Sequence, residues 1–106
     1  MATPSLPTGE QEPKPGEGPS PEEQEAGYFD MIFGGKASDG QKMCVTVTGD
    51  RDPGYGATSR MISECALLLA KAPLSTSGGI WTPASCMGAA LIEALSARAG
   101  MTFTIE

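Results

Sequence analysis

The chemistry open to this 106-residue chain is limited by one absence, because it contains no histidine. Histidine is the commonest general base and metal ligand, so a Ser-His-Asp triad is excluded, and only an unsupported Ser–Lys pairing stays open. Cys44, Cys65 and Cys86 lie too far apart in sequence for the close ligand pairs of a zinc site. They are predicted to be reduced thiols that act mostly as small core residues. A disulfide pair with one free thiol is the alternative.

Two glycine-flanked aromatic segments remain as candidates for a ligand-facing surface. Gly54-Tyr55-Gly56 stands just before a predicted helix, where glycines permit close approach of another backbone or a ligand. Gly78-Gly79 precedes the only tryptophan, an arrangement typical of a ligand wall or of an anchoring turn. Packing and anchoring are therefore the competing interpretations. The candidate interface or ligand-facing residues are Gly54, Tyr55, Gly56, Trp81 and Thr82.

No catalytic, cofactor-binding or metal-binding residue is predicted in this chain. Asp50-Arg51-Asp52 is interpreted as a solvated turn, in preference to a cation site or an acid pair. Gly16-Glu17-Gly18 resembles the start of a phosphate loop, but a dinucleotide fingerprint needs a strand before it and a helix after it. Neither element is predicted there, so this segment is interpreted as flexible linker.

Hydrophobic periodicity predicts the elements that position these segments. Apolar residues alternate from Phe29 to Phe33, and Asp39-Gly40 indicates a hairpin turn before a second alternating strand. The period then becomes helical, and Thr82 followed by Pro83 begins a second helix. The predicted fold is a small two-layer α+β domain of order β-β-α-α-β, with strands at 28–34 and 42–49, helices at about 57–71 and 83–98, and a last strand at 101–106.

The first 26 residues differ from the rest in composition and charge. They hold six acids and one base, a balance of −5, whereas 27–106 hold seven acids and six bases, a balance of −1. This predicts a disordered acidic Pro/Gly-rich segment over 1–26 and the folded domain over 27–106. Without a basic surface, no nucleic-acid partner is expected. No signal peptide or transmembrane segment is recognised, which predicts a cytoplasmic protein.

The predicted core is thin. Two helices with one apolar stripe each, the first running from Met61 to Leu69, and three short strands form a domain of about 80 residues, which is marginal alone. Burial of these apolar faces is therefore expected to need more chain or a partner.

Two blocks of the sequence resemble the carboxyl-terminal end of saccharopine dehydrogenase-like oxidoreductases, a family that includes the bacterial trans-acting enoyl reductases. The first block is GDRDPGYG at 49–56 with the helix start TSRM at 58–61. The second is GGIWTPAS at 78–85, continuing through LIE at 91–93. The segment at 13–20 also resembles a loop of that family, so the resemblance covers about 13–106.

The resemblance implies the carboxyl-terminal substrate or packing portion of an NAD(P)-dependent oxidoreductase that is not catalytic alone. Family members hold NAD(P) on an amino-terminal Rossmann domain whose glycine fingerprint is absent from this sequence, so no cofactor-binding residue is transferred. The implied partner is that nucleotide-binding domain, with a homo-oligomer as a further possibility. The alternative is a small protein–protein interaction module that presents the 28–49 hairpin or the apolar helix face. A stand-alone enzyme is the third and weakest hypothesis.

Overall fold

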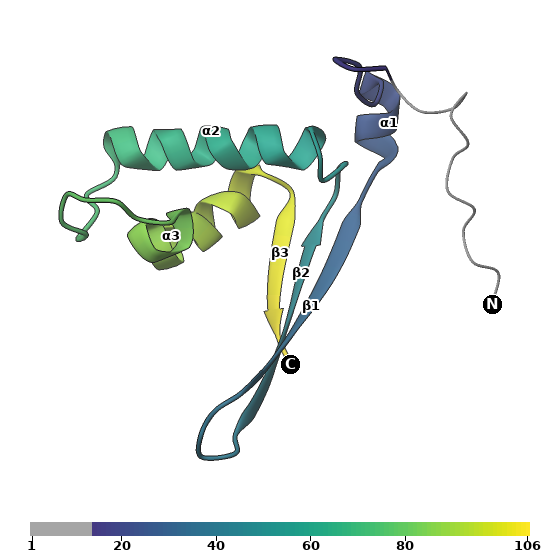
Figure 1. Cartoon of the computed structure of the whole chain (residues 1–106). Helices are drawn as coiled ribbons and strands as arrows, with labels where there is room; N and C mark the ends of the chain where they lie inside the picture. The colour runs from purple at the N-terminus through teal and green to yellow at the C-terminus, as the bar shows by residue number, and fades with distance from the viewer. Residues whose placement is uncertain (1–13) are drawn as a thin grey trace, which may run out of the picture.

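A computed structural model describes residues 14–106 (Figure 1). It confirms the α+β class and the predicted order β-β-α-α-β, with a short helix preceding it. The first strand runs two residues further than predicted, and the first long helix begins one residue earlier. The elements are α1 Pro21–Ala26, β1 Phe29–Lys36, β2 Lys42–Gly49, α2 Gly56–Lys71, α3 Pro83–Arg98 and β3 Met101–Ile105.

The three strands form one antiparallel sheet of order β1-β2-β3. Phe33 pairs with Val45, and Val45 pairs on its other side with Ile105. Because directly paired residues share a face, the alternation in the sequence gives the sheet one apolar and one polar face. At the hairpin turn Gly40 has a φ of 89°, and the Gln41 N–H donates to Asp39 Oδ1 at 3.0 Å. The predicted Asp39-Gly40 turn is confirmed.

The helices cover only one end of the apolar face, and the tip of the β1–β2 hairpin projects away from them (Figure 1). Partly buried residues of β1, β2 and β3 pack against a small cluster, and among residues 14–106 no large side chain is fully buried. The thin core predicted from the sequence is therefore what the described part of the chain contains. The cluster consists of Met87, Leu91, Leu95, Ala99 and Met101.

The predicted apolar stripe of α2 is only partly used. Met61, Cys65 and Leu68 pack against the cluster, whereas Ile62 and Leu69 are 68% and 61% exposed. The stripe is broader than the surface that α3 offers, so its outer residues stay in solvent.

α3 has the predicted boundaries and one unpredicted bend. Thr82 is its N-cap, with Oγ1 accepting from the Ser85 N–H at 3.4 Å, and Gly100 follows its end with a φ of 68°. Inside it, Gly88 adopts φ 48° and ψ −127° and divides the helix into two parts. Only glycine takes up such backbone angles readily, so the bend is located at the one glycine of α3.

A bidentate ion pair joins α2 to the end of α3. Arg98 Nη2 donates to Glu64 Oε2 at 2.7 Å, and Arg98 Nε donates to Glu64 Oε1 at 3.0 Å. The Glu64 side chain is almost fully enclosed. Hydrogen bonds from the Arg98 guanidinium lower the pKa of Glu64, against the opposing effect of burial. Glu64 is thus held as a carboxylate between the two helices.

The segment predicted to be disordered over 1–26 contains one helix in its described part. Ser20 and Glu23 form a capping box at the start of α1, with the Glu23 N–H donating to Ser20 Oγ at 3.2 Å and the Ser20 N–H donating to Glu23 Oε2 at 2.7 Å. The Asp52 N–H donates to the Gln24 carbonyl at 3.0 Å, which attaches α1 to the loop before α2. Local capping therefore overrides the unfavourable composition here. The remaining part of the prediction, residues 1–13, lies outside the described residues.

Candidate functional site

The sequence-predicted segment 54–56 forms the start of α2 and is organised by Asp52. The Asp52 carboxylate accepts from the Tyr55 N–H at 2.6 Å and the Gly56 N–H at 3.2 Å through Oδ2. These two bonds, the Tyr55 bond first, lower the pKa of Asp52. Because Asp52 satisfies the first free N–H groups of the helix, this end of α2 is occupied by the chain itself and not by an external anion.

Close packing explains the second glycine of this segment. Gly56 is buried, and a Cβ at this position would lie 3.2 Å from Arg51 Cβ and 3.4 Å from the Gln24 carbonyl oxygen. The Tyr55 ring is more than half exposed, and a Cβ on Gly18 would lie 3.0 Å from it. Residues 54–56 thus join the long helices to the lead-in segment. Gly54 has no close neighbour except the Asp52 carboxylate.

Trp81 and Thr82 anchor the start of α3. The Trp81 Nε1–H donates to the Ser77 carbonyl at 3.0 Å, and the Thr82 and Ser85 hydroxyls are 2.8 Å apart. Half of the Trp81 surface remains exposed. These hydrogen bonds agree with the interpretation of the segment as an anchoring turn. The exposed side of the Trp81 ring remains free for contact.

A hollow of about 230 Å³ opens beside Trp81, between the second half of α2 and the start of α3 with the loop before it. Its wall is mainly apolar, and its polar groups include two thiols and the hydroxyl of Thr82, the N-cap of α3. It can accommodate a small apolar group, and its side chains offer no carboxylate, imidazole or ammonium for acid–base chemistry. The hollow is lined by Cys65, Leu69, Gly79, Trp81, Thr82, Pro83, Cys86 and Met87.

Most of this lining is not among the residues predicted from the sequence. Trp81 and Thr82 are, whereas the cysteines are predicted mostly as core residues. Cys65 and Leu69 stand four residues apart on α2, as do Thr82 and Cys86 at the start of α3. That spacing places each pair on one helix face and was the available signal.

The two predicted groups of site residues do not come together. Tyr55 precedes the first residue of α2, whereas Trp81 shares the hollow with Cys65 and Leu69 in its second half. A helix of 16 residues is about 24 Å long, so residues 54–56 and residues 81–82 form two separate surfaces.

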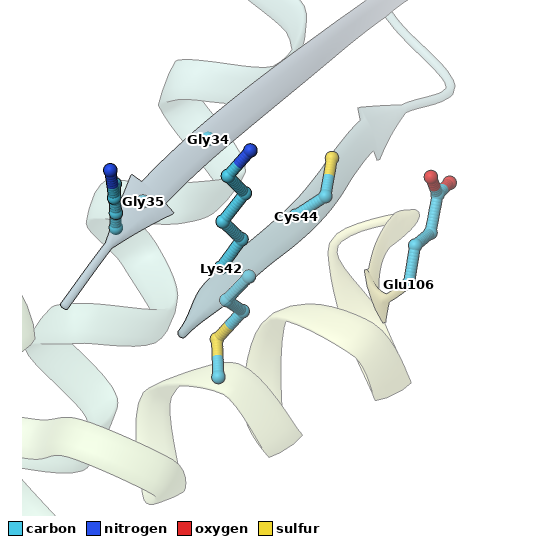
Figure 2. A pocket seen from close by; sticks show the side chains of 7 residues that line it. Gly34, Gly35, Lys42, Cys44 and Glu106 are labelled. Carbon is cyan, nitrogen blue, oxygen red and sulfur yellow. The ribbon is translucent and has the colours of Figure 1, made fainter. Parts of the chain in front are cut away.

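A wider depression of about 480 Å³ lies along the hairpin and the chain end. Figure 2 shows Lys42, Cys44 and Glu106 on the same side of the sheet, as their even positions in the strand register require. The Thr46 hydroxyl donates to Glu106 Oε1 at 3.1 Å. This depression is the open polar face of the sheet. Within residues 14–106, no group of three or more potential metal ligands is gathered in one place.

The opposite, apolar face of the sheet is the larger uncovered feature. Between the helix-covered end of the sheet and the hairpin turn, Met31, Phe33, Met43 and Ile105 are 48–72% exposed, although their register places all four on the face that α3 covers at its other end. Exposed apolar side chains gathered on one face mark a contact surface. We call these four residues the apolar tip. Among the residues described, no helix is long and apolar enough to cross a bilayer.

Comparison with known proteins relates the chain to part of a longer one. It is 42% identical over 87 residues to the protein named "Putative trans-acting enoyl reductase" of Mycobacterium tuberculosis strain H37Rv, and equally to its namesake in strain CDC 1551. The match covers 80% of this chain and 21% of each relative. No family model and no solved structure matches the chain. The chain thus spans about a fifth of the length of the curated relatives, and its similarity is to that part of a longer protein.

Proposed function

We propose that this chain is the carboxyl-terminal substrate or packing portion of a saccharopine dehydrogenase-like, NAD(P)-dependent oxidoreductase of the trans-acting enoyl reductase kind, and that it is not catalytic alone. The observation that carries the proposal is the apolar tip, which has no covering layer among residues 14–106. The 42% identity to one fifth of two Mycobacterium tuberculosis proteins that carry the name trans-acting enoyl reductase supports it.

Burial of the apolar tip under another layer would stabilise the fold by about as much free energy as the core of a small domain supplies. Complete burial of one such side chain stabilises by about 1.5–3 kcal/mol, so burying the exposed half of four side chains is worth on the order of 4 kcal/mol. A single small core supplies roughly 3–5 kcal/mol. An additional layer over Met31, Phe33, Met43 and Ile105 would therefore contribute about as much as this chain's own core.

The residues present in this chain indicate which part of the reaction it could serve. Reduction of an enoyl group needs a hydride donor and a proton donor at the conjugated double bond. This sequence has no glycine fingerprint between a strand and a helix and no histidine, so the proposal assigns hydride transfer to the nucleotide-binding domain of full-length relatives. The role left to this chain is to complete the substrate domain, with the hollow beside Trp81 available for an apolar group.

Complementation of a truncated relative tests the proposal. The H37Rv protein is expressed without its 87 matched residues, alone and together with this chain, and co-elution, thermal stability and NADPH binding by fluorescence are measured. We expect this chain to bind the truncated protein and restore its stability. The variant Met31→Glu/Phe33→Glu should abolish the association, whereas Ile32→Glu on the opposite face should preserve it. If the truncated relative is stable and binds NADPH without this chain, and does not associate with it, the proposal is wrong.

The projecting hairpin favours a second function, an independent protein–protein interaction module. Its turn projects away from the helices (Figure 1), and the exposed side chains of the apolar tip are available to a protein of another kind. The same experiment separates the two functions, because such a module would not restore the truncated oxidoreductase, although it would remain folded by circular dichroism.

A further inference from the structure

The outer edge of β1 is a free row of backbone hydrogen-bonding groups. The Ala37 N–H donates to the Gln41 carbonyl at 2.8 Å and continues the β1–β2 register, so odd-numbered residues of β1 direct their backbone groups towards β2. The backbone groups of Asp30, Ile32, Gly34 and Lys36 consequently point outward. Within residues 14–106 no strand pairs with this edge, which leaves a template for an added strand.

We propose that β1 pairs antiparallel with β1 of a second copy of this chain, about a twofold axis at Phe33. The two three-stranded sheets then become one continuous sheet with both apolar faces on the same side. The outward backbone groups of each copy meet those of the other in this register, since even-numbered residues pair with even-numbered residues.

Charge complementarity selects the register. Pairing about Phe33 places Asp30 of each copy directly opposite Lys36 of the other, on the polar face, and opposite charges in that position stabilise a strand pair. A shift of the axis by one residue in either direction matches neither charge. Neither side chain has an ion-pair partner within residues 14–106, and Lys36 stands opposite Lys42 in its own hairpin. A carboxylate from the second copy would relieve that repulsion.

The two glycines of β1 support the same register. Neither Gly34 nor Gly35 has a positive φ, and a Cβ at either would meet nothing within 4 Å, so no contact inside the chain requires them. In the proposed pairing, Gly34 faces Ile32 of the second copy, Gly35 faces Met31, and the two Phe33 rings meet at the axis. A glycine inside a strand often marks the close approach of another backbone or a large side chain. The dimer would therefore explain why these two positions are glycines, which no contact within the single chain explains.

The pairing uses the lateral edge of the sheet and leaves the apolar tip uncovered over most of its area, so it does not rest on the proposed function. The edge of β1 is paired by an identical strand of a second copy, whereas the apolar tip is covered by a layer of another domain.

Charge exchange tests the dimer. Sedimentation velocity of the full chain at about 100 µM is expected to show a dimer. Asp30→Lys and Lys36→Asp each replace both attractive pairs by repulsive ones and should weaken it about tenfold to a hundredfold. The double variant Asp30→Lys/Lys36→Asp should dimerise again, and a mixture of the two single variants should form the heterodimer. Arg60→Asp on α2 is the matched control and should dimerise as the wild type does. Circular dichroism confirms that each variant is folded.

A cross-link locates the axis independently. With the native cysteines changed to serine, Phe33→Cys should form a disulfide between two copies in oxidised glutathione, which takes up the two electrons and the two protons and leaves as two reduced molecules. Met31→Cys should not, because its sulfurs would be about 13 Å apart along the strands. A monomeric wild type, a double variant as weak as the single ones, or equal cross-linking at both positions would overturn the proposal.

Discussion

The contact of Gly100 with Asp50 gives the sharpest test of how the long helices are joined to the sheet. Gly100 follows α3 with a φ of 68°, and its carbonyl accepts from the Asp50 N–H at 3.2 Å. A Cβ at this position would overlap the Asp50 carboxylate. Gly100→Ala therefore has two separate costs, one in the backbone and one in the contact.

The two costs are of similar size. A left-handed conformation costs a residue with a Cβ about 1–2 kcal/mol, and the reduced entropy of the unfolded chain returns about 0.4–1 kcal/mol, which leaves about 1 kcal/mol. Displacement of the Asp50 carboxylate adds about 1–2 kcal/mol, within the range of couplings between touching residues. We expect Gly100→Ala to lower the free energy of unfolding by about 2–3 kcal/mol in the wild type. In an Asp50→Ala background only the backbone cost, about 1 kcal/mol, should remain.

Urea unfolding followed by circular dichroism and by the fluorescence of Trp81 measures all four members of this double-mutant cycle. Sucrose in every sample keeps the least stable variant folded without changing the comparison. An equal cost of Gly100→Ala in the two backgrounds would refute the proposed overlap, and a stabilising effect would refute the left-handed geometry as well.

Three further predictions concern the core, the ion pair and a helix cap. Leu91→Ala in the core should cost about 2–4 kcal/mol of unfolding free energy in urea, against less than about 1 kcal/mol for the half-exposed Leu67→Ala. Glu64 has its pKa lowered by Arg98, so the pair stabilises fully above the ordinary value of 4.5 and loses its effect as the pH falls through the folded-state value. Glu64→Gln should thus lower the melting temperature at pH 7 and flatten its fall in acid, and an unchanged acid profile would contradict this. Thr82→Ala should cost about 1 kcal/mol in urea unfolding, and Thr82→Ser nearly nothing.

Much of the fold could be predicted because the local signals agree with the tertiary structure. The alternation from Phe29 to Phe33 and the N-cap of Thr82 each specify an element without knowledge of its neighbours. The bend at Gly88 could not be predicted, since a glycine within a helical pattern is compatible with a straight helix. α1 was missed for another reason. Ser20 and Glu23 are a readable capping box, but the proline and acid content around them indicated disorder.

The candidate site was less predictable, because it depends on which helix faces meet. The sequence identified Tyr55 and Trp81 as unusual residues, yet it contains no local signal that they lie on separate surfaces along α2. Likewise, Cys65 and Cys86 line one hollow only because α3 packs against α2 near both. Residues brought together by helix packing are beyond the range of spacing arguments.

The apolar face and the outer edge of β1 require different partners. Alternate residues of β1 belong to one surface or the other. Odd-numbered side chains such as Met31 lie on the apolar face, which only a packed layer can cover, whereas the outward backbone groups belong to even-numbered residues such as Asp30. A charge at Met31 should therefore abolish binding to a truncated oxidoreductase and weaken the edge pairing little. A charge reversal at Asp30 should do the opposite. If both substitutions impaired both interactions equally, the hairpin would be a single contact surface, and the division between packing layer and strand pairing would be wrong.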